Sequence, residues 1–259
     1  MAPDFDGPLV NPLVLMYHRV CADHAARRSE FVVSASTFRR QLRWLHDRGY
    51  WTPRLSDVLR AGGRAPRRPG RPVLLTFDDG YADVLAHAVP ALAEVGFVAS
   101  LFPVLDPALR TNAWDEDPAL RGAPLLSARA LREVEAAGLE LGSHGLRHRW
   151  LTRCGDAELQ DELVRSRALL ASIAARPLPV LAYPYGDVDA RVKRAARDAG
   201  YEAALAVNAG PLEFAADPFE IRRQRVLDRA SDAYLRVLVT GTEKLWQWSK
   251  WRVRNALAS

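Results

Sequence analysis

Short apolar runs alternate with longer stretches of helical periodicity along most of the chain, and this alternation restricts the fold more than any other feature. The apolar runs lie at residues 13–18, 73–77, 98–104, 139–143, 180–183 and 203–207. Apolar strands separated by helices are typical of a parallel sheet that is covered by helices. With about seven such strands in one chain, we expect a closed or nearly closed α/β barrel rather than an open sheet.

Length and composition fit this expectation and exclude several classes of protein. The chain has 259 residues, which suits one α/β barrel. Hydrophobic residues make up 49% and charged residues 26%, a balance that argues against disorder. The net charge is only +5, and no basic motif of a nucleic-acid module occurs, so we expect no nucleic-acid partner.

The cysteines and the N-terminal residues indicate in which cellular compartment the protein is expected. Cys21 and Cys154 form no CxxC pair and no disulfide framework, so we expect reduced thiols. The first residues lack a basic region followed by an apolar one, and no apolar run approaches the ~20 residues of a membrane span. These observations predict a cytoplasmic protein without signal peptide or transmembrane segment.

Two adjacent carboxylates follow the run at 73–77. Asp78 and Asp79 would repel each other unless a cation or a proton lies beside them. Gly80 lets the backbone turn sharply after them. The pair is either part of a charged site or a helix N-cap with a solvated neighbour.

Two histidines follow the run at 139–143. His144 and His148 are four residues apart, a spacing that lets both rings face one point, as in zinc sites. Imidazole and carboxylate ligands together suit Zn²⁺, with Co²⁺ or Ni²⁺ as alternatives. Three protein ligands would leave an open position for water, as a catalytic site requires. The alternative is two exposed polar histidines.

A turn of sequence YPYG follows the run at 180–183. Its second tyrosine, Tyr185, could present a backbone N–H to a reacting oxygen. The alternative is an ordinary turn with a packed tyrosine. In a barrel of parallel strands, the carboxyl ends of all strands share one face, and the active site lies there. The sequence therefore predicts that the three segments meet.

The segments TFDDGY (76–81), SHGLRH (143–148) and YPYG (183–186) resemble the polysaccharide deacetylase family, also called the NodB-homology or carbohydrate esterase 4 group. They occur in the family's order, and the resemblance covers roughly residues 13–226. It implies a distorted (β/α)7 barrel of NodB-homology type and a metal-dependent hydrolase that removes N-acetyl groups from an amino-sugar polysaccharide or a sugar precursor.

The resemblance also implies a role for each matching residue. Asp78 is similar to the general base, and Asp79, His144 and His148 are similar to the metal ligands. The backbone N–H of Tyr185 is similar to the donor that stabilises the oxyanion.

Two departures from the family pattern concern other positions. Ala182 stands where the family often has an arginine, and no histidine follows His148 to serve as the usual C-terminal general acid. In a permuted subgroup, which acts on poly-N-acetylglucosamine, a Tyr-His segment near the N-terminus has that role. The segment MYHRV (16–20) is similar to it, and we assign His18 as the general acid. The alternative is a structural histidine paired with a neighbouring carboxylate.

The C-terminal segment differs in character from the rest. We expect a barrel over residues 1–240 and a basic, Trp-rich helix over 241–259, which holds Trp246, Trp248 and Trp251 among Lys and Arg residues. Such a helix would either bind a membrane surface or pack its tryptophans on the barrel. Membrane binding would place the protein at the inner face of the membrane.

Three other readings of the function stay open at this point. The first is a metal-dependent enzyme with another substrate. It would remove an acyl or formyl group from a lipid-linked amino sugar, or hydrolyse another non-polymeric amide. The second is a non-catalytic glycan-binding barrel, against which the intact Asp78, Asp79, His144 and His148 argue. The third is a barrel in which the motifs are coincidental. The sequence does not indicate an oligomeric state.

Overall fold

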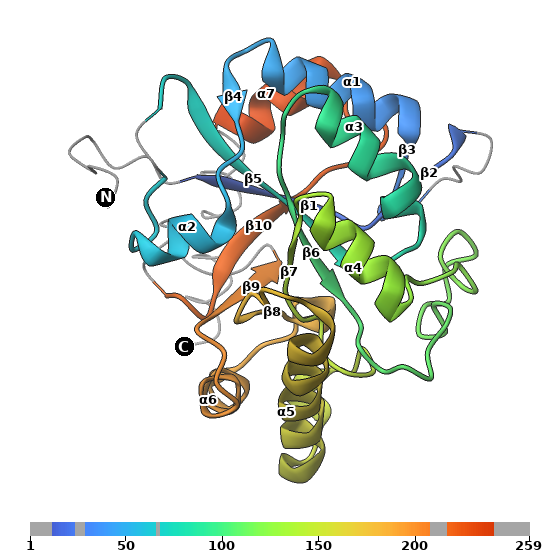
Figure 1. Ribbon diagram of the computed structural model, residues 1–259, viewed down its shortest axis with the longest axis vertical. Coiled ribbons are helices and arrows are strands. Elements are labelled where there is room, and N and C mark those ends of the chain that lie inside the picture. Colours follow the sequence, from blue (N-terminus) through green and yellow to red (C-terminus); the bar gives the residue numbers. More distant parts are fainter. Residues whose placement is uncertain (1–11, 24–28, 66–67, 208–216, 241–259) are drawn as a thin grey trace, which may run out of the picture.

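A parallel sheet of eight strands forms the centre of the protein, and seven of them make one continuous series (Figure 1). The computed structural model describes residues 12–23, 29–65, 68–207 and 217–240. Within these residues, the strands of the continuous series are β1 (Leu13–Tyr17), β5 (Arg71–Asp79), β6 (Ser100–Pro103), β7 (Glu140–Leu141), β8 (Val180–Ala182), β9 (Ala203–Val207) and β10 (Ile221–Arg225). Their order is β7-β6-β5-β1-β10-β9-β8, and each pair is parallel.

The sheet closes on itself through Ser143, two residues after the end of β7. Ser143 forms a parallel bridge to Leu181 of β8. Its N–H donates to the carbonyl of Val180 at 3.0 Å, and its carbonyl accepts from the N–H of Ala182 at 2.8 Å. Around the closed sheet the strands therefore follow one another in chain order. The predicted distorted (β/α)7 barrel is confirmed, and the distortion lies mainly at the two-residue strand β7.

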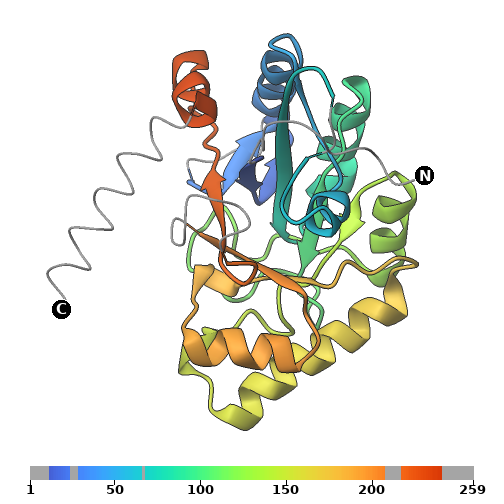
Figure 2. The same cartoon turned by 90° about the vertical axis from the view of Figure 1, so that its left-hand side faces the viewer.

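Helices cover the outside of the sheet. They are α1 (Ala35–His46), α2 (Leu55–Arg60), α3 (Val89–Glu94), α4 (Ala128–Ala136), α5 (Asp156–Ile173), α6 (Ala190–Asp198) and α7 (Asp232–Thr240). Figure 1 shows α1, α3 and α7 together at one end of the molecule and α5 with α6 at the opposite end, and Figure 2 shows the same division from the side. In Figure 1, α2 and α4 lie between these two ends, so helices surround the barrel along its length.

Short elements complete the chain between the strands and helices. A two-stranded parallel pair, β2 (Arg19–Cys21) and β3 (Val32–Ser34), follows β1, and β4 (Tyr50–Trp51) extends the amino end of β5. The turns η2 (Val84–Ala88), η3 (Leu151–Arg153) and η4 (Pro184–Gly186) follow β5, β7 and β8. Turn η3 begins three residues after His148, and turn η4 contains Tyr185.

The barrel interior changes from apolar to charged along the strands. Side chains of alternate residues fill its lower part with one apolar cluster, which includes Val14, Leu74, Phe102, Val180, Leu205 and Ile221. Towards the carboxyl ends, the interior holds Thr76, Asp78 and the guanidinium of Arg223, each at most 1% exposed. Because strand side chains alternate, Leu74, Thr76 and Asp78 lie in one row that leads from the core to the site.

The expected strands before residue 207 are present, although β6 and β7 are shorter than the runs at 98–104 and 139–143. Strand β10 and helix α7 had no counterpart among the predicted elements. The expected C-terminal helix at 241–259 lies outside the described residues, so this helix and the domain boundary at 240 stay predictions. No helix in the described ranges is both long and apolar enough to cross a membrane.

Candidate metal centre and catalytic site

Asp79, His144 and His148 form a buried cluster at the carboxyl ends of β5 and β7. Oδ1 of Asp79 lies 3.4 Å from Nε2 of His144 and 3.3 Å from Nε2 of His148. One ligand atom from each residue lies within 4.8 Å of the others. All three residues are buried, with exposed fractions of 2–7%. The sequence placed these three side chains at strand ends, and the structure brings them together.

The hydrogen bonds of the cluster leave lone pairs for a cation. Nδ1 of His144 lies 2.7 Å from the carbonyl oxygen of Ala182, so this nitrogen carries the proton in the neutral ring and Nε2 is free to bind. In the described part of the chain, Oδ1 of Asp79 is buried and accepts no hydrogen bond. An orphaned buried carboxylate oxygen costs free energy unless a cation or proton satisfies it. The donor set therefore fits a divalent ion such as Zn²⁺.

The carboxylates and the histidine rings of the cluster shift one another's pKa values. Burial alone would raise the pKa of Asp79, but both histidines beside it hold the pKa well below its usual value. Burial also opposes a charged His144, and the carboxylates of Asp78 and Asp79 nevertheless raise the pKa of this ring. Asp79 is therefore an anion in the folded protein, as a metal ligand must be.

Backbone strain is concentrated at this site. Among the described residues, the non-glycine positions with positive φ are Asp79 (69°), His148 (57°) and Tyr185 (60°). A left-handed conformation costs roughly 1–2 kcal/mol for a residue with a Cβ atom. Such strain persists where the surrounding structure enforces it, and it gathers at functional sites. Here it falls on two of the three candidate ligands and on the candidate oxyanion donor.

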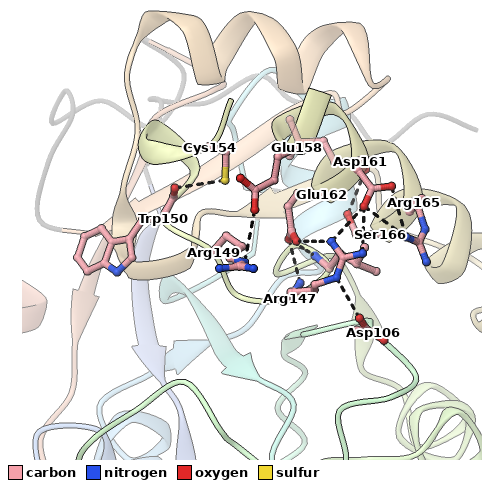
Figure 3. A network of polar contacts seen from close by, with 12 residues as sticks. Asp106, Arg147, Arg149, Trp150, Cys154, Glu158, Asp161, Glu162, Arg165 and Ser166 are labelled. Carbon is pink, nitrogen blue, oxygen red and sulfur yellow. Dashed lines mark hydrogen bonds and ion pairs between the residues drawn. The ribbon is translucent and has the colours of Figure 1, made fainter. Parts of the chain in front are cut away.

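A buried carboxylate fixes the loop that carries both histidines. Oε2 of Glu162, on α5, accepts from the backbone N–H groups of Leu146 and Arg147 at 2.9 Å each. The guanidinium of Arg147 contacts Glu162, Asp161 and Asp106 (Figure 3). Because Glu162 is 0% exposed, its two hydrogen bonds from the loop backbone are shielded from solvent. The loop between the two ligands is therefore attached rigidly to α5.

Asp78 forms a bidentate ion pair with Arg223 of β10. Nη1 and Nη2 of Arg223 lie 2.7 Å from the two carboxylate oxygens of Asp78, and both side chains are almost completely buried. Burial raises the pKa of Asp78, but the charges of Arg223 and His144 outweigh it and lower the pKa below its usual value. Asp78 is therefore held ionised next to the cluster, in one orientation.

The predicted site did not include Arg223. The residue lies in the stretch IRRQR (221–225), whose polar character did not indicate a strand of the barrel. The sequence signal that could have found it is indirect. Ala182 stands where the family often has an arginine, and the stretch 221–225 supplies arginines elsewhere in the chain.

His18 lies at the end of β1 and lines the same cavity as Asp78, Asp79, His144 and His148. Its ring contacts Phe31 edge to face at 4.8 Å. Nδ1 is buried without a hydrogen-bond partner, and no ion pair of His18 occurs in the described ranges, so the alternative of a carboxylate-paired structural histidine has no support. Burial lowers the pKa of His18 to about 4, although Asp79 and Asp78 act in the opposite direction.

Aromatic rings surround the outer side of His148. Trp114 stacks on the imidazole at 4.7 Å, and Tyr185 contacts it edge to face at 4.4 Å. Tyr185 stacks in turn on Trp150 at 4.0 Å, and these two rings are 36% and 40% exposed. Rings packed on His148 in this way fix its orientation. They also form the rim of the site.

The cavity above the cluster has a volume of about 170 Å³. Its lining includes every predicted site residue: His18, Asp78, Asp79, His144, His148 and Tyr185. Asp115, Trp150 and Arg225 also line it. The arrangement combines a cation site, an ionised carboxylate, an imidazole and a strained turn in one cavity, which suits hydrolysis of an acyl group.

The family model described as polysaccharide deacetylase matches residues 65–204. The putative polysaccharide deacetylase YxkH of Bacillus subtilis is 25% identical over 215 residues, which cover 82% of this chain and 70% of that protein.

A second relative matches more locally, and a solved structure matches over most of the fold. The poly-beta-1,6-N-acetyl-D-glucosamine N-deacetylase of Escherichia coli K12 is 29% identical over 107 residues, 41% of this chain and only 15% of that protein. The structure of Streptococcus pyogenes deacetylase PplD in complex with acetate superimposes with a TM-score of 0.72 at 23% identity, covering 88% of this chain and 97% of that one. The last similarity is one of fold.

Proposed function

The chain belongs to the polysaccharide deacetylase family of carbohydrate-deacetylating enzymes, and from this premise we propose that it hydrolyses N-acetyl groups of an amino-sugar glycan with the help of a divalent metal ion. The observation that carries the proposal is the buried Oδ1 of Asp79, which has no hydrogen-bond partner in the described residues and faces the Nε2 atoms of His144 and His148. Zn²⁺ is the ion that this donor set suits best.

We assign Asp79, His144 and His148 to hold the ion. A divalent ion at this position supplies Lewis acidity, which polarises the acyl carbonyl and makes water easier to deprotonate. Three protein ligands leave room for water and substrate. The carbonyl of Ala182 orients His144, and Glu162 fixes the loop to His148, so the ligands are arranged before any ion binds.

Asp78 is the proposed general base. The ion pair with Arg223 keeps its carboxylate charged at neutral pH and directs it into the cavity. It takes the proton of the attacking water as the carbon–oxygen bond forms. A positioned base of this kind accelerates hydrolysis by about 10²–10⁴.

Tyr185 and His18 are assigned to the oxyanion of the intermediate and to the leaving amine. The backbone N–H of Tyr185 is the proposed donor to the oxyanion of the tetrahedral intermediate. His18 is the proposed donor of the proton that the leaving sugar amine needs. Negative charge that develops on the acyl group favours the imidazolium form and opposes the burial that holds the resting pKa of His18 at about 4.

The substrate class is tested by acetate release. Zinc-loaded protein is incubated with N-acetylglucosamine oligomers, with poly-β-1,6-N-acetylglucosamine, and with N-formylated and lipid-linked amino sugars, and the products are analysed by mass spectrometry. We expect at least one N-acetylated glycan to lose acetyl groups. Each loss replaces an acetyl group by hydrogen and lowers the mass by C₂H₂O, about 42 Da. Loss of formyl groups alone would replace it by the deformylase alternative.

A further inference from the structure

Asp115 is a third carboxylate in the catalytic cavity, and the proposed reaction does not use it. It lies in the long loop between β6 and α4, outside the three sequence motifs, and it lines the cavity together with Asp78 and Asp79. Its charge is close enough to affect the pKa of Tyr185, and the charges of Asp79 and His148 affect its own. Asp115 is therefore next to the space where a substrate must lie.

Asn112 holds this carboxylate in a fixed orientation. The buried side-chain amide of Asn112 donates to Oδ2 of Asp115 at 2.7 Å, and its carbonyl oxygen accepts from the backbone N–H of Asp115 at 3.1 Å. The same amide nitrogen donates to the hydroxyl of Tyr81. A side chain fixed from both ends pays little further entropy when it binds a ligand.

The carboxylate has acceptor capacity left. An ionised carboxylate offers about four lone-pair positions, and Asn112 is its one side-chain hydrogen-bond donor among the described residues. No ion pair to Asp115 occurs in the same ranges. The residue is half-buried, and burial raises its pKa, as does the charge of Asp79. A half-buried anion without an ion-pair partner in the described residues is most stable when hydroxyl or N–H donors of a ligand approach it.

We propose that Asp115 is a substrate-recognition residue, which accepts hydrogen bonds from hydroxyl groups of the sugar that carries the scissile acetamide. The inference rests on the proposed function and extends it. Carbohydrate hydroxyls supply the missing donors, and they distinguish a sugar acetamide from a simple acetyl compound. Asp115 thus selects the sugar, while Asp78 and the metal ligands act on the acetyl group.

Asp115→Asn is the main variant, because the amide keeps the shape of the side chain and can still meet Asn112 through its oxygen. Glu116→Gln is the matched control: it removes the same charge from the neighbouring position, where the side chain is 94% exposed. Each protein is assayed on N-acetylglucosamine trimer and on 4-nitrophenyl acetate, an acetyl ester without sugar hydroxyls. Zinc affinity is measured in parallel by competition with a chromogenic chelator.

Loss of a charged hydrogen bond is expected to lower kcat/KM on the trimer about 10- to 100-fold in Asp115→Asn, mainly through KM. Hydrolysis of the ester, zinc affinity and all values for Glu116→Gln should stay within about twofold of the wild type. An equal loss on trimer and ester, or a loss of zinc affinity, would overturn the inference, because Asp115 would then act on the metal centre through Asn112 and Tyr81. An unchanged KM on the trimer would overturn it as well.

The two proposals fail in different ways. If the wild-type protein releases no acetate from any N-acetylated glycan, the proposed function is wrong and the role of Asp115 falls with it. If the wild type is active and Asp115→Asn is equally active on the same glycan, the proposed function stands and only the role of Asp115 is wrong.

Discussion

Replacing Arg223 by methionine removes the charge that holds Asp78 and leaves a buried carboxylate without a partner. Both members of this pair are at most 2% exposed, and two contacts of 2.7 Å join them. Breaking a buried ion pair on one side costs about 3–5 kcal/mol, since the remaining charge is not compensated. For a chain of this length, the melting temperature should fall by roughly 6–20 °C.

Two comparisons distinguish the effect of breaking the ion pair from a non-specific loss of stability caused by the substitution. The double variant Arg223→Met with Asp78→Asn removes both charges and should recover at least about 2 kcal/mol relative to Arg223→Met alone. Arg129→Met breaks an exposed pair with Glu133 on α4, where the side chains are 87% and 50% exposed, and should cost less than about 0.5 kcal/mol.

The effect depends on pH with a definite sign. In the wild type, Arg223 lowers the pKa of Asp78, so the pair stabilises the protein at neutral pH and this contribution is lost as the pH falls below about 4. Without Arg223, burial dominates and raises the pKa of Asp78 above its value in the unfolded chain. Protonation then relieves the buried charge, so the stability of the variant relative to the wild type should recover as the pH falls from neutral.

Urea unfolding of metal-free protein is followed by tryptophan fluorescence at pH 7 and pH 5. It gives the free energy of unfolding of the wild type, of Arg223→Met, of the double variant and of Arg129→Met at each pH. A variant that unfolds at the wild-type urea concentration at pH 7, or a double variant that is no more stable than Arg223→Met, would refute this account of the pair.

Three further substitutions test other parts of the site. Glu162→Gln removes the charge that holds the loop to His148, and zinc affinity in a chelator competition should fall about tenfold, with a lower melting temperature; unchanged affinity would mean that the loop is held without it. His18→Asn should keep its zinc and lose about 10²–10⁴ in kcat for glycan deacetylation, and full activity would remove His18 from the mechanism. In Gly142→Ala the new Cβ would lie 2.3 Å from Cε1 of Phe102 in the barrel interior, so we expect about 1–3 kcal/mol of destabilisation in urea unfolding, and wild-type stability would contradict the tight packing.

Much of the site could be predicted because the topology of the barrel does the assembly. Sequence periodicity reveals the strands that end at or shortly before Asp78, Asp79, His144, His148 and Tyr185, and parallel strands bring their carboxyl ends to one face. The same reasoning placed His18 at the site from the other end of the chain. For these residues, a local sequence pattern was enough to predict that side chains far apart in the sequence lie close together in space.

The other residues of the site carry no such signal. Arg223 meets Asp78 across 145 positions of sequence, from a strand whose polar residues look like a surface segment. Glu162 is one acidic residue among several on α5, and only the packing of that helix on the loop distinguishes it from its exposed neighbours. Asp115 belongs to a loop without periodicity, where the conformation depends on Asn112 and not on a regular hydrogen-bond pattern. Contacts of this kind depend on tertiary packing, which pattern and propensity do not describe.

Metal dependence is tested most directly by acetate release from N-acetylated glycan before and after removal of bound metal. The account predicts that chelator-treated protein loses its activity, that about one equivalent of Zn²⁺ per chain restores it, and that His148→Ala is restored by no amount of the ion because a ligand is missing. Full activity in protein shown to be free of metal would contradict the assignment of Asp79, His144 and His148 as the centre of the enzyme.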